Sequence, residues 1–124
     1  MAVGRADHSE MTYFTYQLRC MDGSLYAGIA SDLKRRMEEH FSKDPKCAKY
    51  TKSHPPACLC SAWESADRAT ASRLEYRLKQ LAKDKKEHLA RGGSLEDLFD
   101  PAFASGYRRL SEAELVSVLP EKNV

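Results

Sequence analysis

Residues 13–41 read YFTYQLRCMDGSLYAGIASDLKRRMEEHF, and this stretch decides the fold. Over residues 13–20, aromatic, β-branched and apolar side chains alternate with polar ones, which is the pattern of a β-strand with two different faces. The dipeptide Asp22-Gly23 indicates a hairpin turn because glycine tolerates a positive φ. Residues 24–30 are therefore predicted to form the returning strand.

The length of that turn decides which side chains share a face of the sheet. A two-residue loop would place Tyr16 and Tyr26 on opposite faces. A three-residue loop that ends at Ser24 would pair Cys20 with Tyr26 and bring both tyrosines and Gly28 to one face. The residues alone leave both turns open.

The residues that follow predict a helix that ends near position 41. Either Ser31 or Asp32 can cap it, since each side chain can accept a hydrogen bond from a free amide of the first turn. Every fourth residue is apolar, namely Leu33, Met37 and Phe41. Arg36 and His40 border this stripe, and an arginine there commonly snorkels or pairs with a carboxylate. The other charged residues are expected in water: Lys34, Arg35, Glu38 and Glu39.

Residues 42–56 contain prolines and interleaved basic residues, which predicts a loop. In it, the side chains that suit phosphate contacts and stacking on a base or sugar are Lys46, Lys49, Tyr50 and Lys52. A solvated surface loop is an equally good interpretation of this composition. Residues 57–63, ACLCSAW, are predicted to form a buried third strand.

A second long helix is predicted over residues 66–83, with Asp67 as its cap. Its apolar positions are Ala71, Leu74, Leu78, Leu81 and Ala82. Glu75 lies within this apolar stripe. Because an unpaired buried carboxylate costs several kcal/mol, Glu75 needs an arginine, hydrogen bonds, a metal ion or a raised pKa. Its position is therefore a functional hint in its own right.

The remainder of the chain predicts short helices without evident chemistry. One spans Lys83 to Ala90 and ends at Gly92-Gly93. Residues 94–99 and 111–119 are two further candidates, the second opening with a Ser-x-x-Glu capping box. We therefore expect a flexible arm over residues 1–11, one domain over 12–91 and an acidic extension over 92–124 that packs on the domain or trails from it.

The charge of the chain suits an anionic partner. The 124 residues carry a net charge of +2, which divides into +5 over residues 1–91 (17 basic, 12 acidic) and −3 over residues 92–124 (3 basic, 6 acidic). A basic body with an acidic tail is compatible with binding nucleic acid. No apolar run approaches the roughly 18 residues of a membrane helix, and the polar N-terminus does not read as a signal peptide. We expect a cytoplasmic monomer or weak homodimer.

The four cysteines permit two interpretations. Cys58 and Cys60 would lie on one face of a strand, so with Cys20 and Cys47 they offer a metal site or two disulfides. The chain has no Cys-x-x-Cys pair, and a cytoplasmic protein keeps its thiols reduced. Small buried hydrophobes are the preferred interpretation.

Taken together in order, these residues resemble the GIY-YIG nuclease superfamily, in its small single-domain bacterial branch. The resemblance is carried by Tyr16-Gln17-Leu18, by Tyr26-Ala27-Gly28, by Asp32 to Arg36 with His40, by AKYTKSHPP at 48–56 and by Glu75, and it covers roughly residues 12–90. The first triplet is Phe14-Thr15-Tyr16 in place of Gly-Ile-Tyr, and Ala27 replaces the usual isoleucine. The late asparagine of several nuclease members has no evident counterpart, because the only asparagine is Asn123.

The resemblance implies an α+β fold, in which a three-stranded antiparallel sheet is flanked by helices and followed by a short helical C-terminal extension. It also implies both tyrosines in one site, which favours the three-residue turn. Gly28 and Arg35 join the basic loop as expected nucleic-acid contacts.

The resemblance further implies a metal-dependent endonuclease that cuts phosphodiester bonds in DNA, with RNA left open. Glu75 would hold Mg²⁺ or Mn²⁺, and Arg36 would bind the scissile phosphate. Tyr16 would take the proton from the attacking water with help from Tyr26 or His40, and the positive charge of Arg36 is expected to lower the pKa of Tyr16. His40 is the rival base on acid–base grounds, since its reference pKa is near 6.5.

Two other classes of protein fit the same residues. One is a nucleic-acid-binding module that keeps the fold without useful turnover, and it predicts no metal-dependent cleavage. The other is a structural or partner-binding protein, which predicts no salt-sensitive affinity for DNA. Nothing in 124 residues resembles an added DNA-reading module, so a nuclease of this kind is expected to have weak sequence preference. Branched or single-stranded DNA is then a possible preferred substrate.

Overall fold

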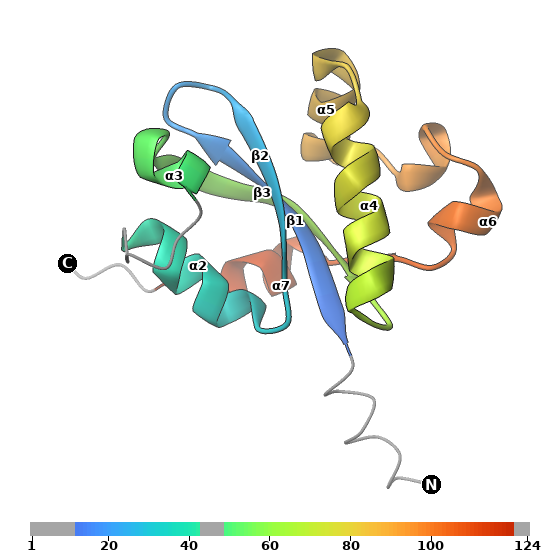
Figure 1. Cartoon of the computed structure of the whole chain (residues 1–124), viewed down its shortest axis with the longest axis horizontal. Helices are drawn as coiled ribbons and strands as arrows, with labels where there is room; N and C mark the ends of the chain where they lie inside the picture. Colours follow the sequence, from blue (N-terminus) through green and yellow to red (C-terminus); the bar gives the residue numbers. More distant parts are fainter. Residues whose placement is uncertain (1–11, 43–48, 121–124) are drawn as a thin grey trace, which may run out of the picture.

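A four-stranded antiparallel sheet lies between two groups of helices in the computed structural model, which describes residues 12–42 and 49–120 except for the side chain of Lys49 (Figure 1). The strands are β1 Tyr13–Cys20, β2 Leu25–Ala30, β3 Pro56–Ser65 and β4 Arg108–Arg109. The helices are α2 Leu33–Phe41, α3 Lys49–Ser53, α4 Arg68–Gln80, α5 Lys83–Ala90, η1 Leu95–Asp97, α6 Pro101–Ala104 and α7 Glu112–Ser117. The α+β class is confirmed.

The sheet has the strand order β2-β1-β3-β4, so the prediction of three strands is wrong by one. The fourth strand consists only of Arg108 and Arg109, which pair with Glu64 and Trp63 of β3. Ion pairs hold it there, since Nη2 of Arg108 lies 2.9 Å from Glu64 and 3.0 Å from Glu114. Two adjacent arginines carry no alternating pattern, which is why the sequence does not predict this strand.

The hairpin between β1 and β2 has a three-residue loop, as the resemblance implied. The loop begins one residue earlier than predicted: the amide of Cys20 donates to the carbonyl of Ser24 at 2.8 Å, and Gly23 has a φ of 87°. In this register Tyr16 pairs with Gly28, and Tyr26 pairs with Leu18, so the predicted pairing of Cys20 with Tyr26 is wrong by two residues. Both tyrosines and Gly28 therefore lie on the same face of the sheet.

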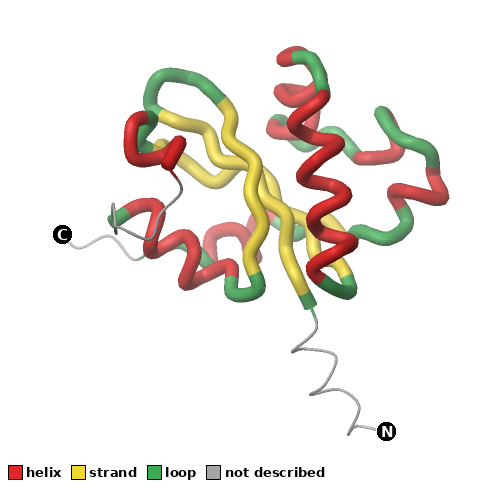
Figure 2. The backbone as a smooth tube through the Cα atoms, viewed as in Figure 1, coloured by secondary structure: helices red, strands yellow, loops and turns green. Residues whose placement is uncertain are grey.

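Two hydrophobic clusters hold the helices on the sheet. Helices α2 and α7 cover the face that carries the tyrosines, where Leu33, Met37 and Leu115 pack with Tyr16 and Leu18. Helices α4, α5 and α6 cover the other face, where Trp63, Leu74, Leu78, Leu89, Leu95 and Ala104 pack together. Figure 2 shows this division, with α2, α3 and α7 on one side of the sheet and α4, α5 and α6 on the other.

Most helix boundaries follow the predicted signals. Asp32 caps α2 by accepting from the amide of Arg35 at 3.1 Å, and Asp67 caps α4 by accepting from the amide of Thr70 at 2.9 Å. Helix α5 ends where Gly92 takes a φ of 107°. Helix α7 begins with the predicted capping box of Ser111 and Glu114. The prediction of a loop over residues 42–56 is wrong in part, because Lys49–Ser53 form α3.

The cysteines in the described part of the chain are free thiols. Cys20 is buried, as predicted, whereas Cys58 is exposed and its Sγ lies 3.8 Å from that of Cys60. Cys47 lies outside the described residues. Among residues 12–42 and 49–120 no three side chains of His, Cys, Asp or Glu gather as a metal site. Nor does any described helix have the length and apolar character that a membrane span requires.

Candidate functional site

Gly28 lies on the edge strand β2 and gives the hydroxyl of Tyr16 room beneath that strand. A Cβ atom added to Gly28 would lie 2.6 Å from Oη and 2.8 Å from Cζ of Tyr16, closer than side chains pack. Because β1 and β2 pair Tyr16 with Gly28, the phenol extends across β2 on the face that α2 covers. The absence of a side chain at position 28 therefore positions the hydroxyl near the free edge of the sheet.

Tyr16, His40 and Thr51 form a hydrogen-bonded chain in the interior. The hydroxyl of Tyr16 lies 2.7 Å from Nε2 of His40, and Nδ1 of His40 lies 2.9 Å from Oγ1 of Thr51. All three residues have an exposed fraction of 0%. The i+7 spacing from Leu33 brings His40 onto the buried side of α2, and Thr51 comes from α3.

Burial keeps both ring side chains of this chain uncharged at neutral pH. Burial, together with the charge of Arg36 and against a smaller opposite effect of Glu39, lowers the pKa of His40 to about 4. It also raises the pKa of Tyr16, and nearby Tyr26 adds to the rise. Arg36 lowers the pKa of Tyr16 as expected, but burial outweighs this effect. A neutral imidazole has one N–H, so the hydrogens run in one direction along the chain.

Tyr26 contacts the buried pair from the half-exposed side. Its ring centroid lies 6.2 Å from that of Tyr16 and 5.7 Å from that of His40. Burial raises its pKa, whereas the charges of Lys79 and Arg36 lower it. The ring of Tyr50 stacks on Tyr26 at 5.6 Å. Tyr26 therefore lies between the buried pair and the charged groups of the site.

The ring of Tyr50 is already engaged within the protein. Besides Tyr26, the ring of His54 stacks on it with centroids 3.9 Å apart and planes 7° apart. The sequence predicted that Tyr50 stacks on a base or sugar, whereas in the structure its ring stacks on Tyr26 and His54. Lys52 is exposed on α3, whereas Lys46 and the side chain of Lys49 lie outside what the structure describes.

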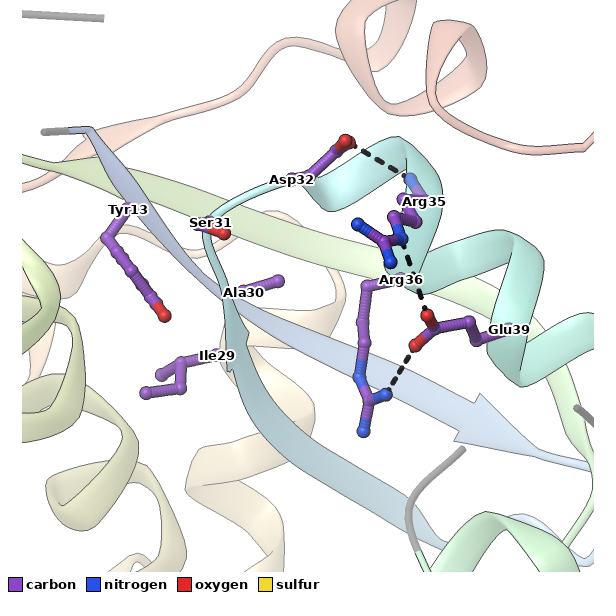
Figure 3. Close-up of a pocket in the computed structure, with 8 residues that line it drawn as sticks. All are labelled: Tyr13, Ile29, Ala30, Ser31, Asp32, Arg35, Arg36 and Glu39. Atoms are coloured by element: carbon purple, nitrogen blue, oxygen red, sulfur yellow. Dashed lines mark hydrogen bonds and ion pairs between the residues drawn. The ribbon is translucent and has the colours of Figure 1, made fainter. Parts of the chain in front are cut away.

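Arg36 lines a small cavity of about 270 Å³ between β2 and α2 (Figure 3). Its Nη1 lies 2.6 Å from Oε1 of Glu39, and Nε of Arg35 lies 3.6 Å from Oε2 of the same carboxylate. Burial works to lower the pKa of Arg36, but hydrogen bonds with Glu39 and Tyr16 raise it overall. Glu39 was expected in water, and this is wrong, because the two guanidinium groups hold its side chain at 15% exposure.

Glu75 reaches the same edge of the sheet from α4, on the opposite face. Its side chain is 23% exposed, and its Oε2 accepts an ion pair from Nζ of Lys79 at 3.2 Å. The predicted need of Glu75 for a partner is thus met by a lysine one turn further along the helix. The charge of Glu75 raises the pKa of both Tyr16 and Tyr26, which indicates that the carboxylate lies near the two phenols.

The structure therefore brings the five predicted catalytic residues to the edge of the sheet formed by β2, from two strands and from one helix on each face. Sequence reasoning missed three partners of these residues. Lys79 follows Glu75 at i+4 spacing and Glu39 follows Arg36 at i+3 spacing, and both spacings are visible signals for an ion pair. Thr51 has no such signal, because its segment was predicted to be a loop.

Among these side chains, the carboxylate of Glu75 is the group that could hold a divalent metal ion. Mg²⁺ keeps several waters and needs only one or two protein carboxylates when a substrate phosphate supplies further oxygens. Glu75 is such a carboxylate, partly exposed, at the edge of the site. Lys79 would have to release it, since ammonium and metal ion compete for the same oxygens.

The comparisons with known proteins agree with the resemblance. Residues 12–88 match the family model of the GIY-YIG catalytic domain. A UPF0213 protein of Fusobacterium nucleatum is 44% identical over 79 residues, which cover 64% of this chain and 77% of the relative. One of Nitratidesulfovibrio vulgaris is 33% identical over 120 residues, which cover 97% of this chain and 100% of the relative. The solution NMR structure of a UPF0213 protein from Bacillus halodurans, 34% identical, covers 77% of this chain and 94% of its own with a TM-score of 0.42.

Proposed function

The chain belongs to the GIY-YIG family, in the small bacterial branch of its UPF0213 relatives, and from this premise we propose that it is a metal-dependent endonuclease that hydrolyses phosphodiester bonds in DNA. The family implies nuclease activity in general. The observation that carries the finer proposal is the buried contact between the hydroxyl of Tyr16 and Nε2 of His40 beside Arg36.

Arg36 is the group that binds the scissile phosphate. Its guanidinium is half-buried in the cavity at the edge of β2, and its planar donors match two phosphate oxygens. In the structure Glu39 occupies those donors, so the phosphate has to replace this carboxylate. In the phosphate-bound state Arg36 stabilises the negative charge that develops in the transition state. Arg35 lines the same cavity and adds a second positive charge.

Tyr16 and His40 together accept the proton of the attacking water. The water donates its proton to Oη of Tyr16 while the phenol proton moves to Nε2 of His40, which is 2.7 Å away and neutral. The oxygen of the water forms a bond to phosphorus as the bridging oxygen leaves with its electron pair. This route needs no free phenolate, which the raised pKa of Tyr16 makes rare.

Access to Tyr16 depends on the side chain of Arg36. Tyr16 has an exposed fraction of 0%, so water reaches its hydroxyl only after a neighbour moves. Arg36 is the hydrogen-bonded neighbour that is itself partly exposed. When Arg36 turns to the phosphate, the hydroxyl opens to the water that the phosphate brings. Substrate binding and activation of the proton acceptor are thereby linked.

Glu75 would hold the metal ion, Mg²⁺ or Mn²⁺, through a carboxylate oxygen. When bound, the ion offsets negative charge on the scissile phosphate and on the leaving oxygen. Lys79 and Tyr26 lie beside this carboxylate and shape the charge around it. Tyr26 positions the Tyr16–His40 pair through its ring contacts.

The substrate we propose is DNA with little sequence preference, with branches, flaps or single-stranded regions as the guide, and with RNA as a second polymer to test. Lys46, Lys49 and Lys52, together with Arg35 and the edge strand at Gly28, would contact its phosphates. We propose that it acts as a monomer or weak homodimer in the bacterial cytoplasm, in DNA repair or recombination. We assign residues 12–91 to the catalytic domain.

A second candidate is a nucleic-acid-binding module of the same fold with little or no turnover. One observation favours it: both carboxylates of the site are neutralised internally, Glu75 by Lys79 and Glu39 by Arg36. If the energy of these pairs exceeds what phosphate and metal ion supply, the site binds DNA without cutting it.

The test is a gel assay on labelled linear, branched and single-stranded DNA and on RNA, with Mg²⁺, Mn²⁺ or EDTA. Wild-type protein is compared with Glu75→Ala and Arg36→Ala. The matched control is Lys34→Ala/Glu38→Ala, which removes one charge of each sign from an exposed pair on α2. Circular dichroism establishes that each variant is folded.

Cleavage by the wild type and the control, with loss in both site variants, supports the nuclease. Binding in low salt without cleavage under any metal condition would replace it by the binding module. Absence of both binding and cleavage would remove nucleic acid as the partner.

A further inference from the structure

Helix α4 presents arginines to solvent without a carboxylate partner. Within the described residues, Arg68, Arg73 and Arg77 make no ion pair, although most of the other arginines do. Instead Arg73 donates to the hydroxyl of Thr70 at 3.2 Å, and the guanidinium of Arg77 lies 4.5 Å from the ring centre of Phe103 on α6. Because no carboxylate in the described part of the chain lies within ion-pair distance of these three guanidinium groups, they leave a positive potential on this face of α4, which favours an anionic partner.

Tyr76 lies between these arginines and is unusually exposed for an aromatic residue. Its exposed fraction is 64%, and no ring of the described residues stacks on it. A shallow cavity of about 340 Å³ is lined by Ser72, Arg73, Tyr76, Arg77 and Phe103. The cavity thus combines two guanidinium groups with an open aromatic ring.

This combination matches a nucleotide of a polymer chain. Aromatic rings stack on bases with little regard to sequence, and arginines contact the phosphates on either side. Arg73 and Arg77 are four residues apart, about 6 Å along the helix axis, a separation that the two phosphates flanking one unpaired nucleotide can match. A protein ligand with acidic groups would not need the exposed ring.

The position of this cavity on α4 connects it to the candidate site. Tyr76 directly follows Glu75, so its side chain lies about 100° further around the helix, away from the edge of the sheet. A strand that leaves the site at Glu75 and crosses the helix would meet Tyr76 and then the two arginines. None of the nucleic-acid contacts expected from the sequence lies on this helix.

We propose that Arg73, Tyr76 and Arg77 form a second nucleic-acid subsite, which binds an unpaired nucleotide and its flanking phosphates on the strand that leaves the site. This inference rests on the proposed function for its choice of polymer. It adds a place where the strand is held at a distance from the bond that is cut.

The experiment measures binding of fluorescent single-stranded DNA in EDTA, where no cleavage takes place, over a range of salt concentrations. The double variant Arg73→Gln/Arg77→Gln should bind at least tenfold more weakly, and the slope of log K against log salt should fall by about 1.4, at 0.7 for each lost phosphate contact. The matched control Lys83→Gln/Lys85→Gln removes two exposed charges from α5 and should change the affinity by less than twofold.

Two further variants separate charge and stacking from loss of structure. Arg73→Lys/Arg77→Lys keeps both charges and should restore most of the salt slope. Tyr76→Ala should weaken binding of single strands about fivefold or more, while Tyr76→Phe should not. Equal effects of the α4 and α5 double variants would overturn the subsite.

The outcomes for the subsite and for the nuclease are distinct. Binding that depends on Arg73 and Arg77 in a protein that never cuts would keep the subsite and reject the nuclease. Cleavage with binding unaffected by these changes would keep the nuclease and reject the subsite. Absence of DNA binding by the wild type rejects both.

Discussion

The hydroxyl of Tyr16 lies 2.7 Å from Nε2 of His40, and neither side chain is exposed to solvent. A buried phenol that hydrogen-bonds a buried neutral imidazole forms a short path for a proton, closed at its far end by Thr51 at 2.9 Å. A water molecule can pass a proton into this path only if a group at the surface moves away from the hydroxyl of Tyr16. Arg36, partly exposed and hydrogen-bonded to Tyr16, is in the place to do so.

Adding one methyl group to Gly28 should displace this pair. In Gly28→Ala the new Cβ would lie 2.6 Å from Oη of Tyr16, whose side chain is fully buried, so the ring or strand β2 would have to shift. We expect a loss of about 1–3 kcal/mol in the free energy of unfolding and at least a tenfold loss of cleavage. Gly106→Ala is the control, because its nearest atom would be 3.6 Å away. Equal stability and activity of both variants would contradict the close approach.

Thr51 should fix the direction of the hydrogen bonds in the chain. Thr51→Val leaves Nδ1 of His40 buried without its partner, which costs about 1–3 kcal/mol of stability. The hydrogen on Nδ1 is then free to move to Nε2, so nitrogen NMR shifts of His40 should report a changed tautomer and cleavage should fall about tenfold. Thr51→Ser keeps the hydroxyl and should restore both. A purely structural role predicts no change in the NMR signal.

The pH dependence of stability should carry the signature of His40. Its pKa is about 4 in the folded protein against about 6.5 when unfolded, so the unfolded state binds more protons between these values. The contribution of His40 is complete above pH 6.5 and is lost as the pH falls through 4, amounting to on the order of 3 kcal/mol. Urea unfolding at pH 7.5 and at pH 5 should show about 2 kcal/mol of this loss, because the remainder is lost only as the pH falls further to about 4. His40→Gln should show a smaller difference between the two conditions.

Removing the charge of Glu39 should free Arg36 for phosphate. In Glu39→Gln the ion pair at 2.6 Å is lost, and we expect DNA or inorganic phosphate to bind a few-fold more tightly. Glu38→Gln makes the same change in charge on the exposed side of α2, where Glu38 pairs weakly with Lys34 at 4.0 Å. If both variants bind with the same affinity, the gain arises from net charge and Glu39 does not compete with the phosphate.

Removing the charge of Lys79 should strengthen the binding of a metal ion to Glu75. Its ammonium lies 3.2 Å from the carboxylate of Glu75, so Lys79→Gln leaves those oxygens free. We expect half-maximal cleavage at a several-fold lower Mg²⁺ concentration and direct binding of Mn²⁺ detectable by calorimetry. Lys83→Gln, on α5, is the control. A need for more metal in Lys79→Gln would show that the lysine assists the site instead.

The sequence predicts which elements carry the candidate residues better than it predicts their partners. Alternation and helix periodicity act within one element and place Tyr16, Tyr26, Arg36, His40 and Glu75 on their strands and helices, while their grouping into one site is what the resemblance implies. Their partners do not follow from these patterns: the contact of Thr51 with His40 joins residues 11 apart in sequence through a helix that was predicted as a loop. In strand β4, Arg108 forms a tertiary ion pair with Glu64, 44 residues away in sequence. No local sequence pattern predicts this contact.

The core that supports Tyr16 also contains Leu110 and Leu115, which belong to the last part of the chain, whereas the match to the catalytic domain ends at residue 88. The match to the catalytic domain and the folded core therefore end at different residues of the chain. A protein shortened after Arg91 would expose the apolar surface beneath α7 and lose the β4 edge, even though every catalytic candidate would remain. Transfer of the proposed nuclease site into another protein would therefore need residues 92–120 as well, because Leu110 and Leu115 complete the core beneath Tyr16.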